Sequence, residues 1–148
     1  MSSPTIVLAG NESQDWDFVW LAAKNAAGDC DVVVLRDGES VVDFFLHHDR
    51  RRGNGCLDQI VEPHKCDLLF LGLFLPKLDG FQVLRQLRWL RRDDVSTLPP
   101  IVMLSDSSDG DLVAGAYRYG ASGFLSTSTS AAQLLDATGQ TVRYWLDA

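Results

Sequence analysis

The sequence is poor in the features that mark secreted and membrane-spanning proteins. It has three cysteines in 148 residues, and their odd number and irregular spacing suit a reducing compartment better than a disulfide framework. No window approaches the run of about 20 apolar residues that a membrane span needs. The first residues lack the basic segment of a secretory signal. We therefore expect a cytoplasmic protein that does not enter a membrane.

Positive charge is also scarce. The chain has 13 Lys and Arg against 20 Asp and Glu, which gives a net charge of −7. Direct binding of nucleic acid depends on clustered Lys and Arg that neutralise phosphates, so we do not expect it here. The one basic cluster, residues 49–55, is expected in a solvated loop after a helix that ends at His47 and His48, with contact to an anionic patch on a partner as the alternative.

Motifs of known catalytic and phosphate-binding sites are missing. Residues 9–13 match neither the dinucleotide-binding glycine motif nor the P-loop. No Ser/His/Asp or Cys/His arrangement can be assembled without forcing it. The spacing of Cys56, His64 and Cys66 matches no zinc-site pattern. The sequence therefore predicts neither an enzyme nor a resident metal or cofactor.

What the chain does have is five short apolar runs that alternate with helical patterns. The runs are continuous, as expected of parallel strands that are covered on both faces; they are residues 5–9, 31–35, 67–72, 100–105 and 122–126. Helices are predicted over residues 13–27, 39–48, 79–92, 108–119 and 130–146. Asp79 and Gln82 have the spacing of a capping box at the start of the third helix.

This alternation predicts one doubly wound α/β domain over residues 1–148, with right-handed crossovers. For five strands the common flavodoxin-like order is 2-1-3-4-5, which places the switch point between the first and third strands. The functional crevice is then expected beyond the C-terminal ends of the strands, near residues 9–12, 72–74, 105–106 and 126–128.

In this order and spacing the chain resembles the receiver domain of bacterial response regulators, the CheY-like family. The resemblance rests on "LPKLDGFQVLRQLR" (75–88), "PPIVMLS" (99–105) and "YGASGFLS" (119–126). The closing "RYWL" (143–146) and the long loop before the third strand resemble single-domain receivers that partner phytochrome-type sensor kinases. The resemblance implies a role in two-component, or phosphorelay, signal transduction.

The resemblance also assigns the phosphorylation site, and the acidic residues of that site are missing. The phosphoacceptor aspartate falls on Gly72, and the acidic pair after the first strand falls on Gly10 and Asn11. Shifting the first loop by one residue would make Asn11 and Glu12 the pair and recover one carboxylate. The lysine before the fifth helix falls on Thr127.

Other positions of the site are replaced or retained in kind. The proline after the lysine falls on Ser128, whereas the hydroxyl that senses the phosphoryl group is retained as Ser105 and the aromatic switch as Phe124. Asp106 follows Ser105, and its carboxylate either stands in for the phosphoryl group or caps the fourth helix. Hydroxyls of residues 126–130 gather at a helix N-terminus, where capping or an anion would explain them.

The chemistry of these positions predicts a pseudo-receiver. Glycine supplies no nucleophile for a phosphoryl group, and Thr127 cannot pair with phosphoryl oxygens as a lysine would. Mg²⁺ prefers carboxylate oxygens, yet Gly10, Gly72, the neutral Asn11 and the carbonyl of Phe74 are what remain, so Mg²⁺ binding is expected to be lost. The alternatives are a phosphorylatable receiver that uses Glu12 or Asp106, and a binding module gated by a small anion or ligand.

Output is expected through protein–protein contact, with a sensor kinase, an output protein or a second copy as partner. The resemblance places the interface on the fourth helix, fifth strand and fifth helix, where apolar and aromatic groups suit an interface; the candidates are Leu112, Val113, Ala116, Tyr117, Tyr119 and Trp145, near Phe124. Trp16, Trp20 and Trp89 are expected to serve the core rather than a contact.

Overall fold

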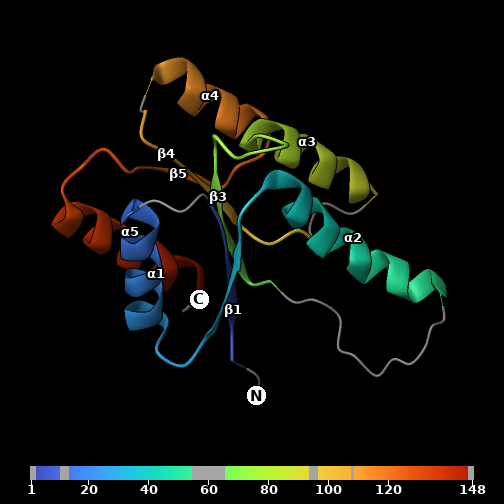
Figure 1. Ribbon diagram of the computed structural model, residues 1–148, viewed down its shortest axis with the longest axis horizontal. Coiled ribbons are helices and arrows are strands. Elements are labelled where there is room, and N and C mark those ends of the chain that lie inside the picture. The colour runs from blue at the N-terminus through green and yellow to red at the C-terminus, as the bar shows by residue number, and fades with distance from the viewer. Residues whose placement is uncertain (1–2, 11–13, 55–65, 94–96, 108, 147–148) are drawn as a thin grey trace.

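The computed structural model describes residues 3–10, 14–54, 66–93, 97–107 and 109–146. Five strands alternate with five helices along the chain (Figure 1). The strands are β1 (Thr5–Ala9), β2 (Asp31–Leu35), β3 (Leu68–Gly72), β4 (Ile101–Ser105) and β5 (Gly123–Ser126). The helices are α1 (Gln14–Ala27), α2 (Gly38–Asn54), α3 (Gly80–Leu90), α4 (Gly110–Arg118) and α5 (Ala131–Leu146).

The strands form one parallel sheet in the order β2-β1-β3-β4-β5, so the predicted doubly wound, flavodoxin-like fold is confirmed. Each predicted strand agrees with an observed one to within a residue at either end. β1, β3 and β4 are buried along their whole length, which explains why their sequences are continuous apolar runs rather than alternating ones.

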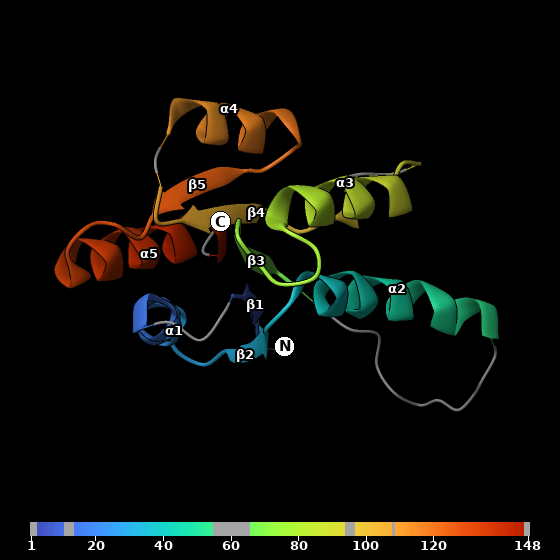
Figure 2. The ribbon, with the colours of Figure 1, turned by 45° about the horizontal axis from the view of Figure 1, so that its top comes forward.

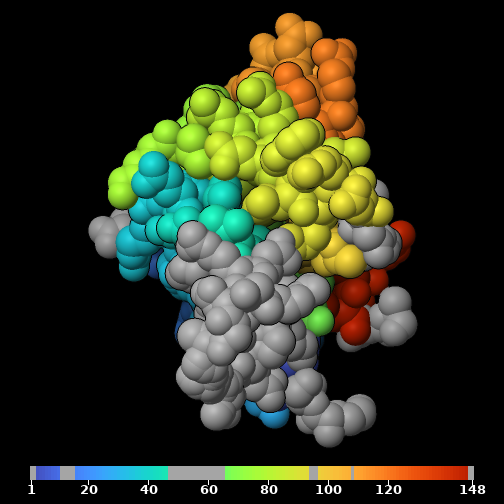
Figure 3. All heavy atoms as spheres, turned by 90° about the vertical axis from the view of Figure 1, so that its right-hand side faces the viewer, coloured from blue at the N-terminus to red at the C-terminus, as the bar shows by residue number. Residues whose placement is uncertain are grey.

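Helices cover both faces of the sheet. α1 packs along α5 on one face, and α2 packs on α3 on the other (Figure 2). Alternate residues of β1 point to opposite faces: Ile6 and Leu8 join the core cluster under α1 and α5, whereas Val7 and Ala9 join the cluster under α2 and α3. Figure 3 shows α4, in orange, at one end of the face formed by α2 and α3.

The predicted end of the second helix is wrong. The sequence predicts that this helix ends at residue 48 and that residues 49–55 form a loop, but α2 continues to Asn54. Arginine is a good helix former, and the helix-breaking Gly53 comes only at the end of the segment. The basic residues 50–52 are therefore part of a helix.

The start of α3 is set by the predicted capping box. Asp79 Oδ1 accepts a hydrogen bond from the Gln82 backbone N–H at 2.9 Å, and Gln82 Oε1 accepts one from the Asp79 N–H at 2.9 Å. Gly80 then approaches β3, and its N–H donates to the Leu73 carbonyl at 2.7 Å. A β-carbon at Gly80 would lie 2.6 Å from the Gly72 carbonyl oxygen, so this close approach requires glycine.

The loop between β3 and α3 is also tied to the start of α2. Gly38 N–H donates to the Pro76 carbonyl at 3.1 Å, and Lys77 takes a left-handed φ of 71° that lets the Leu78 N–H reach the same carbonyl at 2.8 Å. Lys77 Nζ lies 3.8 Å from carboxylate oxygens of both Asp37 and Glu39. These contacts hold the loop whose first residues line the candidate site.

Two of the three tryptophans expected in the core are on the surface. Trp20 is 41% exposed and Trp89 is 64% exposed, so the expectation is wrong for both. Trp89 stays outside with the guanidinium of Arg92 stacked on its ring at 3.9 Å. Trp16 is half-buried and packs against the core cluster under α1 and α5. Among the described helices, none is both long and apolar enough to cross a membrane.

Candidate functional site

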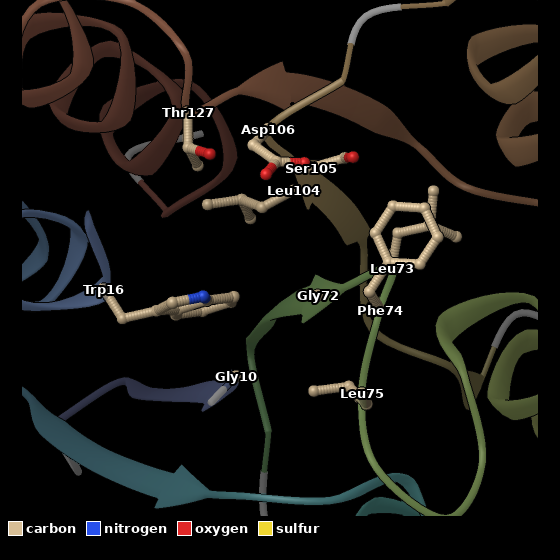
Figure 4. A pocket seen from close by; sticks show the side chains of 10 residues that line it. All are labelled: Gly10, Trp16, Gly72, Leu73, Phe74, Leu75, Leu104, Ser105, Asp106 and Thr127. Atoms are coloured by element: carbon tan, nitrogen blue, oxygen red, sulfur yellow. The ribbon is translucent and has the colours of Figure 1, made fainter. Parts of the chain in front are cut away.

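A cavity of about 160 Å³ lies at the C-terminal ends of β1, β3 and β4 (Figure 4). We call it the strand-end cavity, and it is lined by Gly10, Trp16, Gly72, Leu73, Phe74, Leu75, Leu104, Ser105, Asp106 and Thr127. The parallel register brings these residues together, because Gly72 pairs with Leu104 and Ser105 pairs with Ser126. The cavity lies at the switch point that the strand order predicts.

Six residues that the sequence analysis assigned to the site line this cavity together: Gly10, Gly72, Phe74, Ser105, Asp106 and Thr127. Asn11 and Glu12 lie outside the described residues. Phe124 does not line the cavity. It is half-buried on β5 and packs against the core cluster under α2 and α3, to which Leu112 and Tyr119 also contribute.

Backbone hydrogen bonds continue the sheet past the strand ends and fix the walls of the cavity. The Gly10 N–H donates to the Leu35 carbonyl at 3.0 Å, and the Leu73 N–H donates to the Leu104 carbonyl at 2.9 Å. The Thr127 N–H donates to the Ser105 carbonyl at 2.9 Å. These bonds hold Gly10, the residue after Gly72 and the residue after β5 in fixed positions on the cavity wall.

The indole of Trp16 reaches toward both glycines (Figure 4). A β-carbon at Gly10 would overlap the ring. A β-carbon at Gly72 would lie 3.1 Å from Trp16 Cζ2, 3.1 Å from the Ala9 carbonyl oxygen and 3.4 Å from Leu75 Cδ2. This role of Trp16 is not predicted by the sequence motifs, and the available signal is a large aromatic in the first turn of the helix that follows Gly10.

Ser105 and Thr127 are both buried, at 5% and 8% exposure. The Ser105 hydroxyl oxygen accepts a hydrogen bond from the Ser107 N–H at 3.0 Å, so it is engaged within the loop between β4 and α4. Thr127 occupies the position that the family resemblance assigns to a lysine. Its short neutral side chain brings no positive charge to the cavity.

Asp106 is the one carboxylate among the described residues that line the cavity, and it is exposed. Figure 4 shows it on the same side of the cavity as Ser105 and Thr127. Its expected role as the cap of the fourth helix is wrong, because α4 is capped by Asp109, whose Oδ1 accepts from the Asp111 N–H at 2.8 Å. The alternative, a stand-in for the phosphoryl group, remains a prediction.

The hydroxyl cluster after β5 is satisfied by bonds within the cluster and to the start of α5. The hydroxyls of Ser126 and Ser128 lie 2.8 Å apart, and Thr129 donates to the Ser130 carbonyl at 3.4 Å. Ser130 Oγ accepts from the Gln133 N–H at 3.2 Å near the start of α5. These bonds engage the hydroxyls of Ser126, Ser128, Thr129 and Ser130, and binding of an anion at this helix N-terminus stays a prediction.

The strand-end cavity does not fit a magnesium ion. Mg²⁺ needs near-octahedral oxygen ligands, with carboxylates supplying charge, but the described lining residues offer one exposed carboxylate, the hydroxyls of Ser105 and Thr127, and an indole ring. No group of three or more His, Cys, Asp or Glu that could hold a metal occurs among the described residues. Cys66 is not a ready metal ligand either, because burial raises the pKa of its thiol to about 12.

Comparison with known proteins identifies the family of this fold. Residues 51–138, more than half of the chain, match the family model of the response regulator receiver domain. This span includes the positions of Gly72, Ser105 and Thr127, and it begins after Gly10. A match of this extent shows the family.

Two regulatory proteins match over most of the chain. The probable methanogenesis regulatory protein FilR2 of Methanothrix harundinacea is 30% identical over 112 residues, covering 76% of this chain but 64% of FilR2, just under two thirds of its length. Response regulator Rcp1 of Synechocystis is 24% identical over 145 residues, which are 97% of this chain and 90% of Rcp1.

Solved structures at lower identity show the same fold. The phosphorylated cyanobacterial phytochrome response regulator RcpA has a TM-score of 0.77 at 24% identity, over 98% of this chain and 95% of that one. The regulator RPA3017, described in red light signalling of R. palustris, has a TM-score of 0.73 at 23% identity, over 97% and 94%. The chain therefore belongs to the response regulator receiver domains, the signalling modules of two-component systems.

Proposed function

We propose that this receiver domain is not phosphorylated and that it acts in two-component signalling by binding other proteins. The observation that carries the proposal is Gly72. It lies at the C-terminal end of β3, on the wall of the strand-end cavity, where the family resemblance places the phosphoacceptor. Transfer of a phosphoryl group to a carboxylate needs that nucleophile at a fixed place, and glycine supplies none.

The remaining groups of the cavity support the same conclusion. A phosphoryl group carries negative charge that Lys, Arg or a metal ion must balance in the transition state. The described lining residues include no Lys or Arg, and the lysine position holds the buried Thr127. Among the described residues that line the cavity, the phosphoacceptor position has no side chain, no group is positively charged, and Asp106 is the one carboxylate.

The proposed contact surface is centred on α4. Tyr117 is 51% exposed, and Leu112 and Val113 are half-buried beside it on the same helix. Ala116 is completely buried, so it belongs to the core rather than to the surface. Tyr119 is half-buried with its ring centroid 5.3 Å from that of Phe81. Ala116 and Tyr119 hold α4 against the core, and Leu112 also packs partly against it. The proposed contact surface is formed by Tyr117 and Val113 with the exposed part of Leu112.

The C-terminal end of α5 adds a second aromatic group at the surface. Tyr144 is 71% exposed, and its ring meets that of the half-buried Trp145 edge-on with centroids 4.9 Å apart. We propose a cytoplasmic location and a protein partner: a sensor kinase, an output protein or a second copy of the chain. We do not expect the chain to contact nucleic acid or a membrane directly.

Acetyl phosphate tests the proposal directly. The purified chain is incubated with acetyl phosphate and Mg²⁺, alongside a phosphorylatable receiver as positive control, and its intact mass is measured. We expect no phosphoryl adduct. An adduct that forms on the wild-type chain and disappears in Asp106→Asn would replace the proposal with the alternative in which Asp106, the exposed carboxylate of the cavity, is the acceptor.

A binding measurement tests the second half of the proposal. Affinity for a cognate sensor kinase, and self-association by sedimentation, are measured with and without acetyl phosphate. We expect neither to change with the phosphodonor, and we expect Tyr117→Ala to weaken the contact. Trp89→Ala removes another exposed aromatic, from α3, and serves as the matched control.

A further inference from the structure

We infer that Trp16 is a built-in occupant of the site, and that its indole closes the space between Gly10 and Gly72 to a divalent cation even if carboxylates are restored there. The inference deepens the proposed function and rests on it: the missing carboxylates explain why the site does not react, and Trp16 explains why returning them would not be enough.

First, side chains at positions 10 and 72 would conflict sterically with the indole of Trp16. Any residue other than glycine at position 10 would place its β-carbon in the indole of Trp16. Real β-carbons do not approach other heavy atoms so closely, so the ring or the backbone would have to move. At position 72 the contact is milder, because a β-carbon would lie 3.1 Å from Trp16 Cζ2. The ring therefore stands where side chains from both strand ends would have to meet around a metal.

The second step is that the ring is held in place. Val19 and Ala23 follow Trp16 at helical spacing on the same face of α1, and both are completely buried. α1 packs along α5, and Trp16 itself contacts the core cluster between these helices and the sheet. Because the rest of this face is fixed in the core, moving the indole aside would remove its packing and expose apolar surface.

The third step is chemical. A hard cation such as Mg²⁺ or Mn²⁺ prefers oxygen ligands, and the indole offers it carbon atoms. A carboxylate introduced beside the ring would also lose part of its hydration, and the single Nε1–H donor of the indole could replace only a fraction of it, which is unfavourable for a charged group. The indole therefore makes the space at the ends of β1 and β3 apolar, like the core, and unfavourable for charged groups.

Restoring the carboxylates with and without Trp16 tests the inference. The pair Gly10→Asp and Gly72→Asp is made in three backgrounds: Trp16 retained, Trp16→Ala, and Trp20→Ala. The last is a matched control, since Trp20 lies on the same helix, is 41% exposed and does not line the cavity. Binding of Mn²⁺ is measured from the electron paramagnetic resonance signal of the free ion, and folding from circular dichroism.

We expect the restored pair to bind Mn²⁺ about tenfold or more tightly once Trp16 is replaced by Ala, the scale on which groups beside metal ligands change affinity. The Trp20→Ala background should behave like the one that retains Trp16. If the pair unfolds the chain with Trp16 present but not with Trp16→Ala, the steric conflict is shown by the folding measurement and the inference stands.

Two results would overturn the inference. In the first, the restored pair folds and binds Mn²⁺ equally tightly with and without Trp16. In the second, Trp16→Ala leaves the restored pair folded but still without Mn²⁺ binding. Neither result bears on the proposed function, which is tested with the wild-type chain. A phosphoryl adduct on the wild-type chain would contradict the proposed function, whatever the restored variants do.

Discussion

The indole ring of Trp16 lies so close to Gly10 that a β-carbon at position 10 would overlap it. The indole of Trp16 can take this position only because residue 10 is a glycine. The ring occupies the space directly beside Gly10, at the edge of the strand-end cavity, and it comes from the core-facing side of α1.

This relationship predicts that Gly10 and Trp16 are energetically coupled. Gly10→Ala should lower the free energy of unfolding by about 1–3 kcal/mol, as overpacking of a filled site does. In a Trp16→Ala background the same change should have little effect, because the overlapping ring is gone. Urea unfolding of the four proteins gives the coupling energy, which for contacting residues is about 0.5–3 kcal/mol.

The control for this cycle is Trp20→Ala, which removes a tryptophan from the same helix at an exposed position. In that background Gly10→Ala should keep its full effect. Trp16→Leu gives a milder second variant where Trp16→Ala is too unstable to measure. Equal effects of Gly10→Ala with and without the Trp16 indole would show that the two residues are independent, against the structure.

Gly72 should tolerate a methyl group better than Gly10. A β-carbon at position 72 would lie 3.1 Å from the Ala9 carbonyl oxygen and from Trp16 Cζ2, so neighbours must shift by a few tenths of an ångström. Replacing glycine by alanine also restricts the unfolded chain, which offsets about 0.4–1 kcal/mol. We expect Gly72→Ala to lower the free energy of unfolding less than Gly10→Ala does. The reverse order in urea unfolding would contradict the described packing.

The capping box predicts a loss of stability at the start of α3. Asp79→Ala removes the acceptor of the Gln82 N–H and should lower the free energy of unfolding by about 1 kcal/mol. Asp79→Asn keeps an acceptor and should lose less. The exposed Asp93→Ala is the control for removing a carboxylate from the end of the same segment. A loss for Asp79→Ala no larger than for Asp93→Ala would rule out a stabilising cap.

The lowered pKa of Asp37 predicts that this residue contributes to the pH dependence of the free energy of unfolding in acid. Its Oδ1 accepts the Ser40 backbone N–H at 2.8 Å, and this bond, followed by bonding to the Ser40 side chain and the charge of Lys77, lowers the pKa of Asp37 below its ordinary value of 3.8. A carboxyl whose pKa is lower in the folded chain stabilises the fold while it is ionised. That stabilisation is present above pH 3.8 and is lost as the pH falls through the folded pKa.

Asp37→Asn keeps a capping side chain but cannot titrate. We therefore expect the variant to lose less stability than the wild type as the pH is lowered below 3.8. The measurement is the urea midpoint of both proteins across that range, with the exposed Asp93→Asn as control. Parallel pH profiles of wild type and Asp37→Asn would show that ionised Asp37 does not stabilise the fold.

The strands could be predicted because continuous apolar runs indicate burial on both faces, and their order because five alternating strands and helices commonly form the order 2-1-3-4-5. The end of α2 was predicted wrongly because a cluster of charged residues is typical of a solvated loop, although arginine is also a good helix former and the helix continues to Asn54. The cap of α4 also depended on the backbone: the Ser107 N–H turns back to Ser105 Oγ, and the helix then begins after Asp109 instead of Asp106.

The site itself was only partly predictable. Placing Gly10, Gly72 and Thr127 at one edge follows from parallel strand ends, which always meet there. The role of Trp16 does not follow, since helical spacing shows which face a residue is on but not how far a ring reaches along the sheet. Trp20 is a neighbour on the same helix and is exposed, so aromatic character alone did not distinguish the two.

Amide chemical shifts measured during a Mg²⁺ titration, followed by addition of beryllofluoride, test the central claim most directly. The claim is that the strand-end cavity holds neither metal nor phosphoryl group. We predict that the amides of Gly10, Gly72, Ser105 and Thr127, which lie around the cavity, keep their shifts throughout. Saturable shifts confined to these amides would contradict the account.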